Sequence, residues 1–149
     1  MEAVIFVGIQ GSGKSTFFKE KFADTHIRIN LDMLRTKHRE KLFLETCFEA
    51  KQQFVVDKIN LTREEREGLI SAAKSYGFRV VGYYLQTDLT KALERNGRRE
   101  GKARIPDKGL LGSVKRLQIP EYAEGFDELF YVSIDDENRF VVERWRDEI

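Results

Sequence analysis

A continuous apolar run, residues 3–7, passes directly into a glycine-rich loop near the start of the chain. An uninterrupted run of this length is typical of a strand buried on both faces, as in a parallel sheet covered by helices. The loop, Gly8-Ile9-Gln10-Gly11-Ser12-Gly13-Lys14-Ser15, satisfies the pattern GxxxxGK[ST] in full. Between a strand and a helix, such a loop surrounds a phosphate with backbone N–H groups. This segment therefore predicts a βα unit that binds a phosphorylated ligand.

The rest of the chain alternates short apolar runs with longer amphipathic segments, the signature of βαβ units. We expect further strands at residues 26–30, 54–56, 78–85 and 129–134, with residues 139–145 forming a hairpin with the last. We expect helices at residues 13–22, 32–51, 62–76, 88–97 and 106–117, and the irregular apolar period of 32–51 allows two helices there. The predicted fold is α/β, a parallel sheet of about five strands with helices on both faces. Its 149 residues fit one domain.

The residues of the glycine loop have distinct expected roles. Glycines let the backbone approach the phosphates, and the helix that follows adds its positive end. Lys14 is expected to reach the β- and γ-phosphates of ATP, and the hydroxyl of Ser15 to hold Mg²⁺. We also expect Lys14 to face solvent until ATP arrives. The full set of expected nucleotide contacts in the loop is Gly8, Gly11, Ser12, Gly13, Lys14, Ser15 and Thr16.

The segments after the loop separate the classes of P-loop protein. The chain has no Asn-Lys-x-Asp pattern for guanine, and oligomeric ATPases need far more residues. A small kinase needs a carboxylate near the end of its second strand to activate the acceptor, and Asp32 lies there with Arg35 one turn on. Asp32 could instead only cap the helix that begins there. Asp57, at the end of the third strand, fits either a ligand of Mg²⁺-bound water or an acceptor contact.

These segments resemble the polynucleotide 5′-hydroxyl kinase family over most of the chain. The resemblance rests on the glycine loop, on Asn-Leu-Asp-Met-Leu-Arg at 30–35, on Val-Val-Asp-Lys-Ile-Asn-Leu-Thr at 55–62 with Arg66, and on Arg-Asn-Gly-Arg-Arg at 95–99. It implies a P-loop kinase fold in which Asp32 is the general base and Arg35 binds the acceptor phosphate. It also implies that Arg95 and Arg99 close over the phosphates of ATP. The implied acceptor is the 5′-hydroxyl end of RNA or DNA, and we expect this chain to hold the kinase domain alone.

Basic residues concentrate between Lys91 and Arg116, where nine of them stand against three acidic ones. This segment carries a net charge of +6, whereas the whole chain carries +1. A phosphotransferase must neutralise a polyphosphate, so we expect a lid at about residues 91–118 that binds ATP through Arg95 and Arg99. Arg98, one step away, could replace either of them. An ordinary solvated surface is the alternative.

Composition bears on location and partners. The hydrophobic fraction of 41% and charged fraction of 34% describe a soluble protein, and the longest apolar run is too short to span a bilayer. We expect no secretory signal, because Met1 and Glu2 run directly into the first strand. The single cysteine, Cys47, fits a packing role in a reducing cytoplasm. His26 and His38 show no metal-binding pattern, and no obligate protein partner is evident.

Two other functions are compatible with the same residues. The first is a P-loop kinase for a small metabolite, a nucleotide sugar or an antibiotic, because such kinases place a carboxylate at a similar point. The second is a nucleotide-dependent binding module or toxin component with little turnover. Length-dependent, salt-weakened acceptor binding would distinguish a polynucleotide kinase from both.

Overall fold

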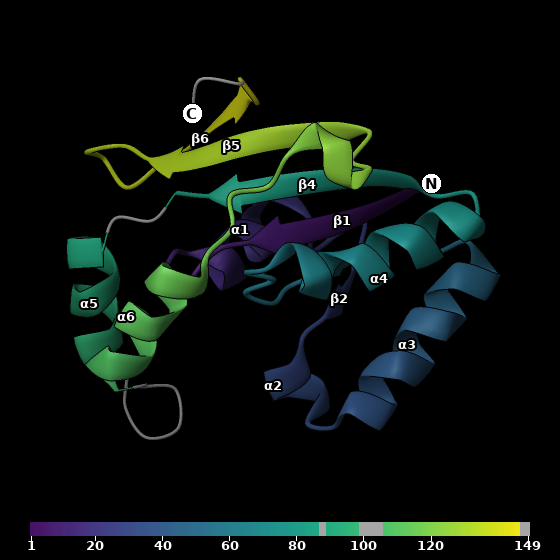
Figure 1. Cartoon of the computed structure of the whole chain (residues 1–149), viewed down its shortest axis with the longest axis horizontal. Coiled ribbons are helices and arrows are strands. Elements are labelled where there is room, and N and C mark those ends of the chain that lie inside the picture. Colours follow the sequence, from purple (N-terminus) through teal and green to yellow (C-terminus); the bar gives the residue numbers. More distant parts are fainter. Residues whose placement is uncertain (87–88, 99–105, 147–149) are drawn as a thin grey trace.

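One sheet organises the molecule, and the computed structural model describes residues 1–86, 89–98 and 106–146, apart from the side chain of Arg95. The strands are β1 (Glu2–Val7), β2 (Ile27–Ile29), β3 (Phe54–Val56), β4 (Arg79–Leu85), β5 (Glu128–Ile134) and β6 (Phe140–Arg144). The helices are α1 (Lys14–Lys21), α2 (Leu31–Leu34), α3 (Lys37–Ala50), α4 (Arg63–Ser75), α5 (Leu89–Arg98), α6 (Asp107–Arg116) and the short 3₁₀ helix η2 (Tyr122–Glu124). Figure 1 shows this arrangement.

The strand order is β2-β3-β1-β4-β5-β6, and the first five strands run parallel. β6 runs antiparallel to β5 as the second strand of a hairpin. β1 lies at the centre, with Val4 opposite Val55 of β3 on one side and Val81 of β4 on the other. Residues 3–7 are each at most 1% exposed, as their continuous apolar run predicts. The expected parallel sheet is confirmed, and the expected hairpin supplies its sixth strand.

Alternate residues of β1 pack on opposite faces of the sheet, because strand side chains alternate in direction. Val4 and Phe6 face α1, where Phe17 packs with its ring centroid 5.5 Å from that of Phe6. Burial among these rings and nearby carboxylates, the first effect being the larger, raises the pKa of Tyr83 to about 12. This aromatic layer extends to the β5–β6 hairpin through Phe140, whose ring lies 5.1 Å from that of Phe17.

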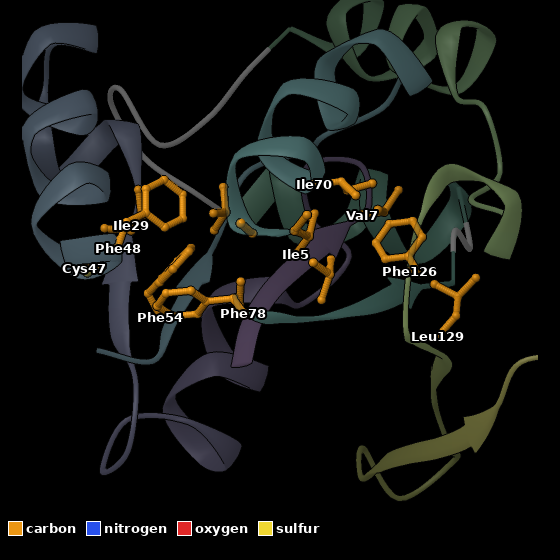
Figure 2. Packing of buried hydrophobic residues seen from close by; sticks show 14 of the residues in the cluster. Ile5, Val7, Ile29, Cys47, Phe48, Phe54, Ile70, Phe78, Phe126 and Leu129 are labelled. Atoms are coloured by element: carbon orange, nitrogen blue, oxygen red, sulfur yellow. The ribbon is translucent and has the colours of Figure 1, made fainter. Parts of the chain in front are cut away.

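The opposite face of the sheet is covered by α3 and α4 (Figure 2). Ile5 and Val7 of β1 point to this side, together with Ile29 of β2. Cys47 of α3 is buried here, and burial raises the pKa of its thiol. The expected packing role of Cys47 is therefore confirmed, as is the expectation of helices on both faces.

The segment expected as one or two helices at residues 32–51 forms two. Asn30 caps α2, since its Oδ1 accepts a hydrogen bond from the Met33 N–H at 3.0 Å. Arg35 then turns the chain at a φ of 75°, and Thr36 caps α3. α4 begins as the sequence predicts, because the Thr62 hydroxyl accepts a hydrogen bond from the Glu65 N–H at 3.2 Å. These caps fix where each helix leaves the sheet.

α5 and α6 lie together beyond the carboxyl ends of β1 and β4 (Figure 1). A small third core joins them to the loops at that edge, with Ala92 of α5 and Leu110 of α6 packed against Ile9 and Leu61. The described parts of the basic segment, α5 and α6, therefore lie at the edge of the sheet where parallel α/β folds bind ligands. Within the described residues, none of the helices has the length and apolarity that crossing a membrane requires.

Candidate active site

The glycine loop between β1 and α1 forms the floor of the candidate site. Gly11 and Gly13 have φ values of 79° and 99°, a region that favours glycine, and Gly13 is the residue before α1. A Cβ atom added at Gly11 would lie 2.9 Å from the carbonyl oxygen of Ala92 in α5. The Gly8 N–H donates to the Ile59 carbonyl at 3.0 Å, which ties the loop to the segment after β3. The glycines therefore allow the loop to curve, and the absence of a side chain at Gly11 allows the loop to contact α5 closely.

The ammonium group of Lys14 is folded back over the loop. Its Nζ donates to the carbonyl oxygens of Gly8 at 2.9 Å and Ile9 at 2.8 Å. Lys14 is half-exposed and lines the pocket, so the expectation that it faces solvent until a nucleotide arrives holds only in part, because its ammonium group binds the loop carbonyls. The loop carbonyls compete with water for the ammonium and hold the positive charge over the start of α1, where an anion is favoured.

Asp32 lies in the first turn of α2 with its side chain exposed. Asn30 provides the cap, and its Nδ2 also donates to the Asp57 carbonyl at 3.0 Å. The interpretation of Asp32 as the helix cap is therefore wrong. Arg35 does not share a helix face with Asp32, since α2 ends at Leu34 and Arg35 adopts a positive φ just beyond it.

Asp57 follows β3 and is 2% exposed. Its Oδ2 accepts a hydrogen bond from Nε of Arg28 in β2 at 2.8 Å and forms an ion pair with NH2 of the same guanidinium, also at 2.8 Å. The same guanidinium donates to the Ser15 hydroxyl at 2.8 Å. Arg28 is not among the candidate site residues predicted from the sequence. The available signal was a charged residue between two apolar residues, Ile27 and Ile29, in a short predicted strand. Arg28 joins three elements of the site.

The residues after Asp57 that contribute to the family resemblance hold the backbone of the site. Asn60 is 3% exposed, and its Nδ2 donates to the Phe6 carbonyl at 2.7 Å. Arg66 is completely buried and donates to the Asn60 and Leu61 carbonyls at 2.8 and 3.1 Å. Its guanidinium also pairs with Glu124 at 2.8 Å. These side chains fix the path of residues 57–62 below the site.

A pocket of about 800 Å³ opens at this edge of the sheet. Seven of the residues predicted for the site line it together, namely Gly11, Gly13, Lys14, Ser15, Thr16, Asp32 and Asp57. Among the described residues, Gly8, Ser12 and Arg35 are not part of the lining. Arg99 and the side chain of Arg95 lie outside the described residues, whereas Arg98 lines the pocket.

The β5–β6 hairpin contributes a wall that the sequence did not indicate, made of Ile134, Asn138 and Phe140. Its turn is held by Asp135, whose Oδ1 accepts from the backbone N–H groups of Arg139 and Glu137, both at 2.9 Å. The bond from Arg139 first, and then that from Glu137, hold the pKa of Asp135 below its ordinary value. The hairpin therefore presents Asn138 and Phe140 in a fixed position beside Gly13.

The donor set fits a nucleotide-bound cation better than a metal held by protein alone. In the described part of the chain, no three or more His, Cys, Asp or Glu side chains gather as a metal site. The Ser15 hydroxyl and the Asp57 carboxylate are hard oxygen donors of the kind that Mg²⁺ uses together with substrate phosphates. Lys14 and the start of α1 favour an anion beside them.

A phosphate-binding loop between β1 and α1, at the carboxyl edge of a parallel sheet with this strand order, defines a P-loop protein with a kinase-like fold. The chain belongs to the AAA domain family, whose model matches residues 35–119, more than half of its length. The match begins after the glycine loop, so the loop and the family match are separate signals.

Known proteins similar to the chain include several phosphotransferases. The bifunctional polynucleotide phosphatase/kinase of Schizosaccharomyces pombe is 27% identical over 129 residues, which are 84% of this chain and 32% of that protein. The chain thus spans about a third of the length of that relative. The structure of Kti12 from Chaetomium thermophilum with ADP-AlF3 has a TM-score of 0.66 and 20% identity, over 90% of each chain. A gluconokinase from Sinorhizobium meliloti has a TM-score of 0.61 and 21% identity, over 89% of this chain and 82% of that one.

Proposed function

We propose that the chain is an ATP- and Mg²⁺-dependent phosphotransferase that moves the γ-phosphate to the 5′-hydroxyl end of a polynucleotide. The observation that carries the proposal is the position of Asp32, whose exposed carboxylate lines the pocket of the phosphate-binding loop and caps no helix. A carboxylate there can accept the proton of an attacking hydroxyl. The resemblance of residues 30–35 and the similarity to a polynucleotide phosphatase/kinase favour a polynucleotide acceptor.

Each part of the pocket has a role in this reaction. The loop amides and Lys14 bind the phosphates. Ser15 and Asp57 would hold a Mg²⁺ ion that enters with the nucleotide, and the ion would supply positive charge against the phosphates. Residues 1–149 then act as one kinase domain, with a lid at about residues 91–118. In this proposal Arg95 and Arg99 stabilise the transferred group from that lid. Arg98, which lines the pocket, is available to replace either of them.

The acceptor enters on the side of Asp32. Lys58 lines the pocket there and forms an ion pair with Glu40 at 3.3 Å, so its charge is held in place. Lys58 and Arg35 are the basic side chains that would meet the phosphates of a nucleic acid end. A polynucleotide then binds with an affinity that falls as salt rises.

The test is transfer from γ-labelled ATP to 5′-hydroxyl RNA and DNA oligonucleotides of increasing length, with and without Mg²⁺. We expect labelled 5′ ends, no labelling of 5′-phosphorylated oligonucleotides, and none with Lys14→Ala. Gluconate and nucleosides serve as small acceptors in parallel. Label on a small acceptor alone contradicts the polynucleotide assignment, and tight ATP binding without any labelled product favours a binding module.

A further inference from the structure

The guanidinium of Arg28 lies between two groups expected to serve Mg²⁺. It donates to Asp57 Oδ2 and to Ser15 Oγ, each at 2.8 Å, and Asp57 is 2% exposed. The side chain of Arg28 is 23% exposed, and its guanidinium carbon lies 5.8 Å from the centroid of the Phe18 ring. Three contacts therefore hold the group in one place on the edge strand β2.

A cation at Ser15 and the guanidinium of Arg28 compete for the same atoms. Mg²⁺ needs near-octahedral oxygen ligands at about 2.0–2.1 Å, and Arg28 already uses a lone pair of the hydroxyl and of the carboxylate. A divalent and a monovalent cation about 4 Å apart also repel strongly, even at an effective dielectric constant of about 20. The carboxylate of Asp57 can balance one of these charges.

We propose that Arg28 is a positioning residue that takes the place of the metal in the Mg²⁺-free protein and must leave Asp57 when Mg²⁺ binds with the nucleotide. Without Mg²⁺, the guanidinium keeps the buried Asp57 paired and adds positive charge beside the phosphates. With Mg²⁺, the lost ion pair opposes metal binding. Arg28 thus lowers the dependence of nucleotide affinity on Mg²⁺. The inference rests on the proposed function to the extent that the loop binds a nucleotide with Mg²⁺.

The experiment measures the Kd of a non-hydrolysable ATP analogue with Mg²⁺ and with EDTA, in the full chain without acceptor. Arg28→Gln removes the positive charge and keeps a polar side chain. For this variant we expect the ratio of the EDTA Kd to the Mg²⁺ Kd to rise about fivefold or more over wild type, the scale of coupling between two ligands. The Mg²⁺ concentration for half-maximal binding should fall. Arg28→Lys keeps a charge for Asp57 but cannot donate to both partners in the same way, so we expect an intermediate ratio.

Lys19→Gln is the matched control, because it removes an exposed positive charge one turn beyond Ser15 on the same helix. Its ratio should stay at the wild-type value. Circular dichroism identifies a variant that does not fold. If Arg28→Gln does not fold, the Kd ratio of Arg28→Lys tests the proposal. A wild-type ratio in the folded Arg28 variants overturns this inference alone. A wild-type protein that binds no nucleotide overturns the proposed function as well.

Discussion

At the scale of the residue, the structure assigns Asp32 neither a capping role nor a place in the hydrophobic core. Asn30 caps the helix, and Asp32 contributes an exposed carboxylate to the pocket. Because Asp32 is exposed and is not the cap, its replacement by the isosteric Asn should cost little stability. The proposed chemistry at Asp32 can therefore be separated from folding.

We predict that Asp32→Asn lowers turnover by about 10² to 10⁴-fold, the usual contribution of a general base. The Kd for ATP should change little, because Asp32 is proposed to act on the acceptor. Turnover, nucleotide titration and thermal unfolding of the same preparation check this. Asn30→Ala provides the contrast, with an expected loss of about 1 kcal/mol of stability as a cap is removed. A loss of stability in Asp32→Asn that matches its loss of activity would contradict the assignment.

The sequence predicts those site residues that belong to a short motif with fixed spacing. The spacing of Gly11, Gly13 and Lys14 within one loop specifies their neighbours, and the pocket brings that loop together with Asp32 and Asp57. Other contacts depend on packing between distant segments, and no spacing in the chain reports them. The bonds from Arg28 to Ser15 and Asp57 belong to this group. The folding of Lys14 onto Gly8 and Ile9 is local, but the glycine pattern does not specify it.

At the scale of the element, the predicted strands and helices appear with ends shifted by at most a few residues. Caps and turn residues explain this success, since Thr62 and Gly77 mark the ends of α4 in the sequence itself. The break between α2 and α3 was left open, because Arg35 adopts a positive φ that its residue type does not favour. Local preference alone therefore does not predict that turn.

α4 carries a natural comparison between a buried and an exposed ion pair. Arg66 with Glu124 is 0% and 10% exposed, whereas Arg63 with Glu121 is 52% and 56% exposed. We predict that Arg66→Met lowers the free energy of unfolding by about 3–5 kcal/mol, because it takes the guanidinium away from the Glu124 carboxylate and from the buried Asn60 and Leu61 carbonyls. Arg63→Met, the control, should cost about 1 kcal/mol or less. Urea unfolding of both variants tests this, and equal losses would contradict it.

Two glycines should respond in opposite ways to alanine. Gly68 lies inside α4 with nothing within 4 Å of an added Cβ, so Gly68→Ala should raise the free energy of unfolding by about 0.5–1 kcal/mol. A Cβ at Gly82 in β4 would lie 2.7 Å from side-chain atoms of both Leu129 and Phe126. We therefore expect Gly82→Ala to destabilise the protein by about 1–3 kcal/mol. Thermal melting of both variants gives the comparison, and a stabilising Gly82→Ala would refute the close packing.

At the scale of the whole molecule, the hydrophobic cores on the two faces of the sheet hold the parallel strands and the covering helices together. The reactivity of the Cys47 thiol measures whether the core under α3 is intact. The thiol is 2% exposed, and burial raises its pKa above the ordinary value of 9.0. We predict that the native protein reacts slowly with a thiol reagent at pH 8 and reacts at once in urea. Because the folded pKa is the higher one, the stability linked to Cys47 is present below pH 9.0 and is lost as the pH rises through the folded pKa. Fast native labelling would contradict this packing.

The position of α5 and α6 is compatible with the lid that we propose for the basic segment. Both helices are anchored to the loops of the sheet edge by the small core around Ile9 and Leu110, and Arg98 already lines the pocket. A lid built on these helices can close over a nucleotide by moving as a unit, which would exclude water from the transferred phosphate. A solvated surface would have no reason to respond to ATP.

We predict that a non-hydrolysable ATP analogue with Mg²⁺ protects residues 91–118 from proteolysis, and that the effect depends on the arginines. A lysine at 95, 98 or 99 keeps the charge but loses the planar fork that binds two phosphate oxygens at once. We therefore expect Arg95→Lys and Arg99→Lys to lower both protection and turnover by about tenfold, a loss of about 1.4 kcal/mol each. Arg98→Lys shows whether the arginine that lines the pocket replaces either of them. Lys115→Ala, at the far end of α6, is the control and should retain both. If all four variants keep wild-type protection and turnover, the +6 segment is not a lid, and its charge must serve the solvated surface alone.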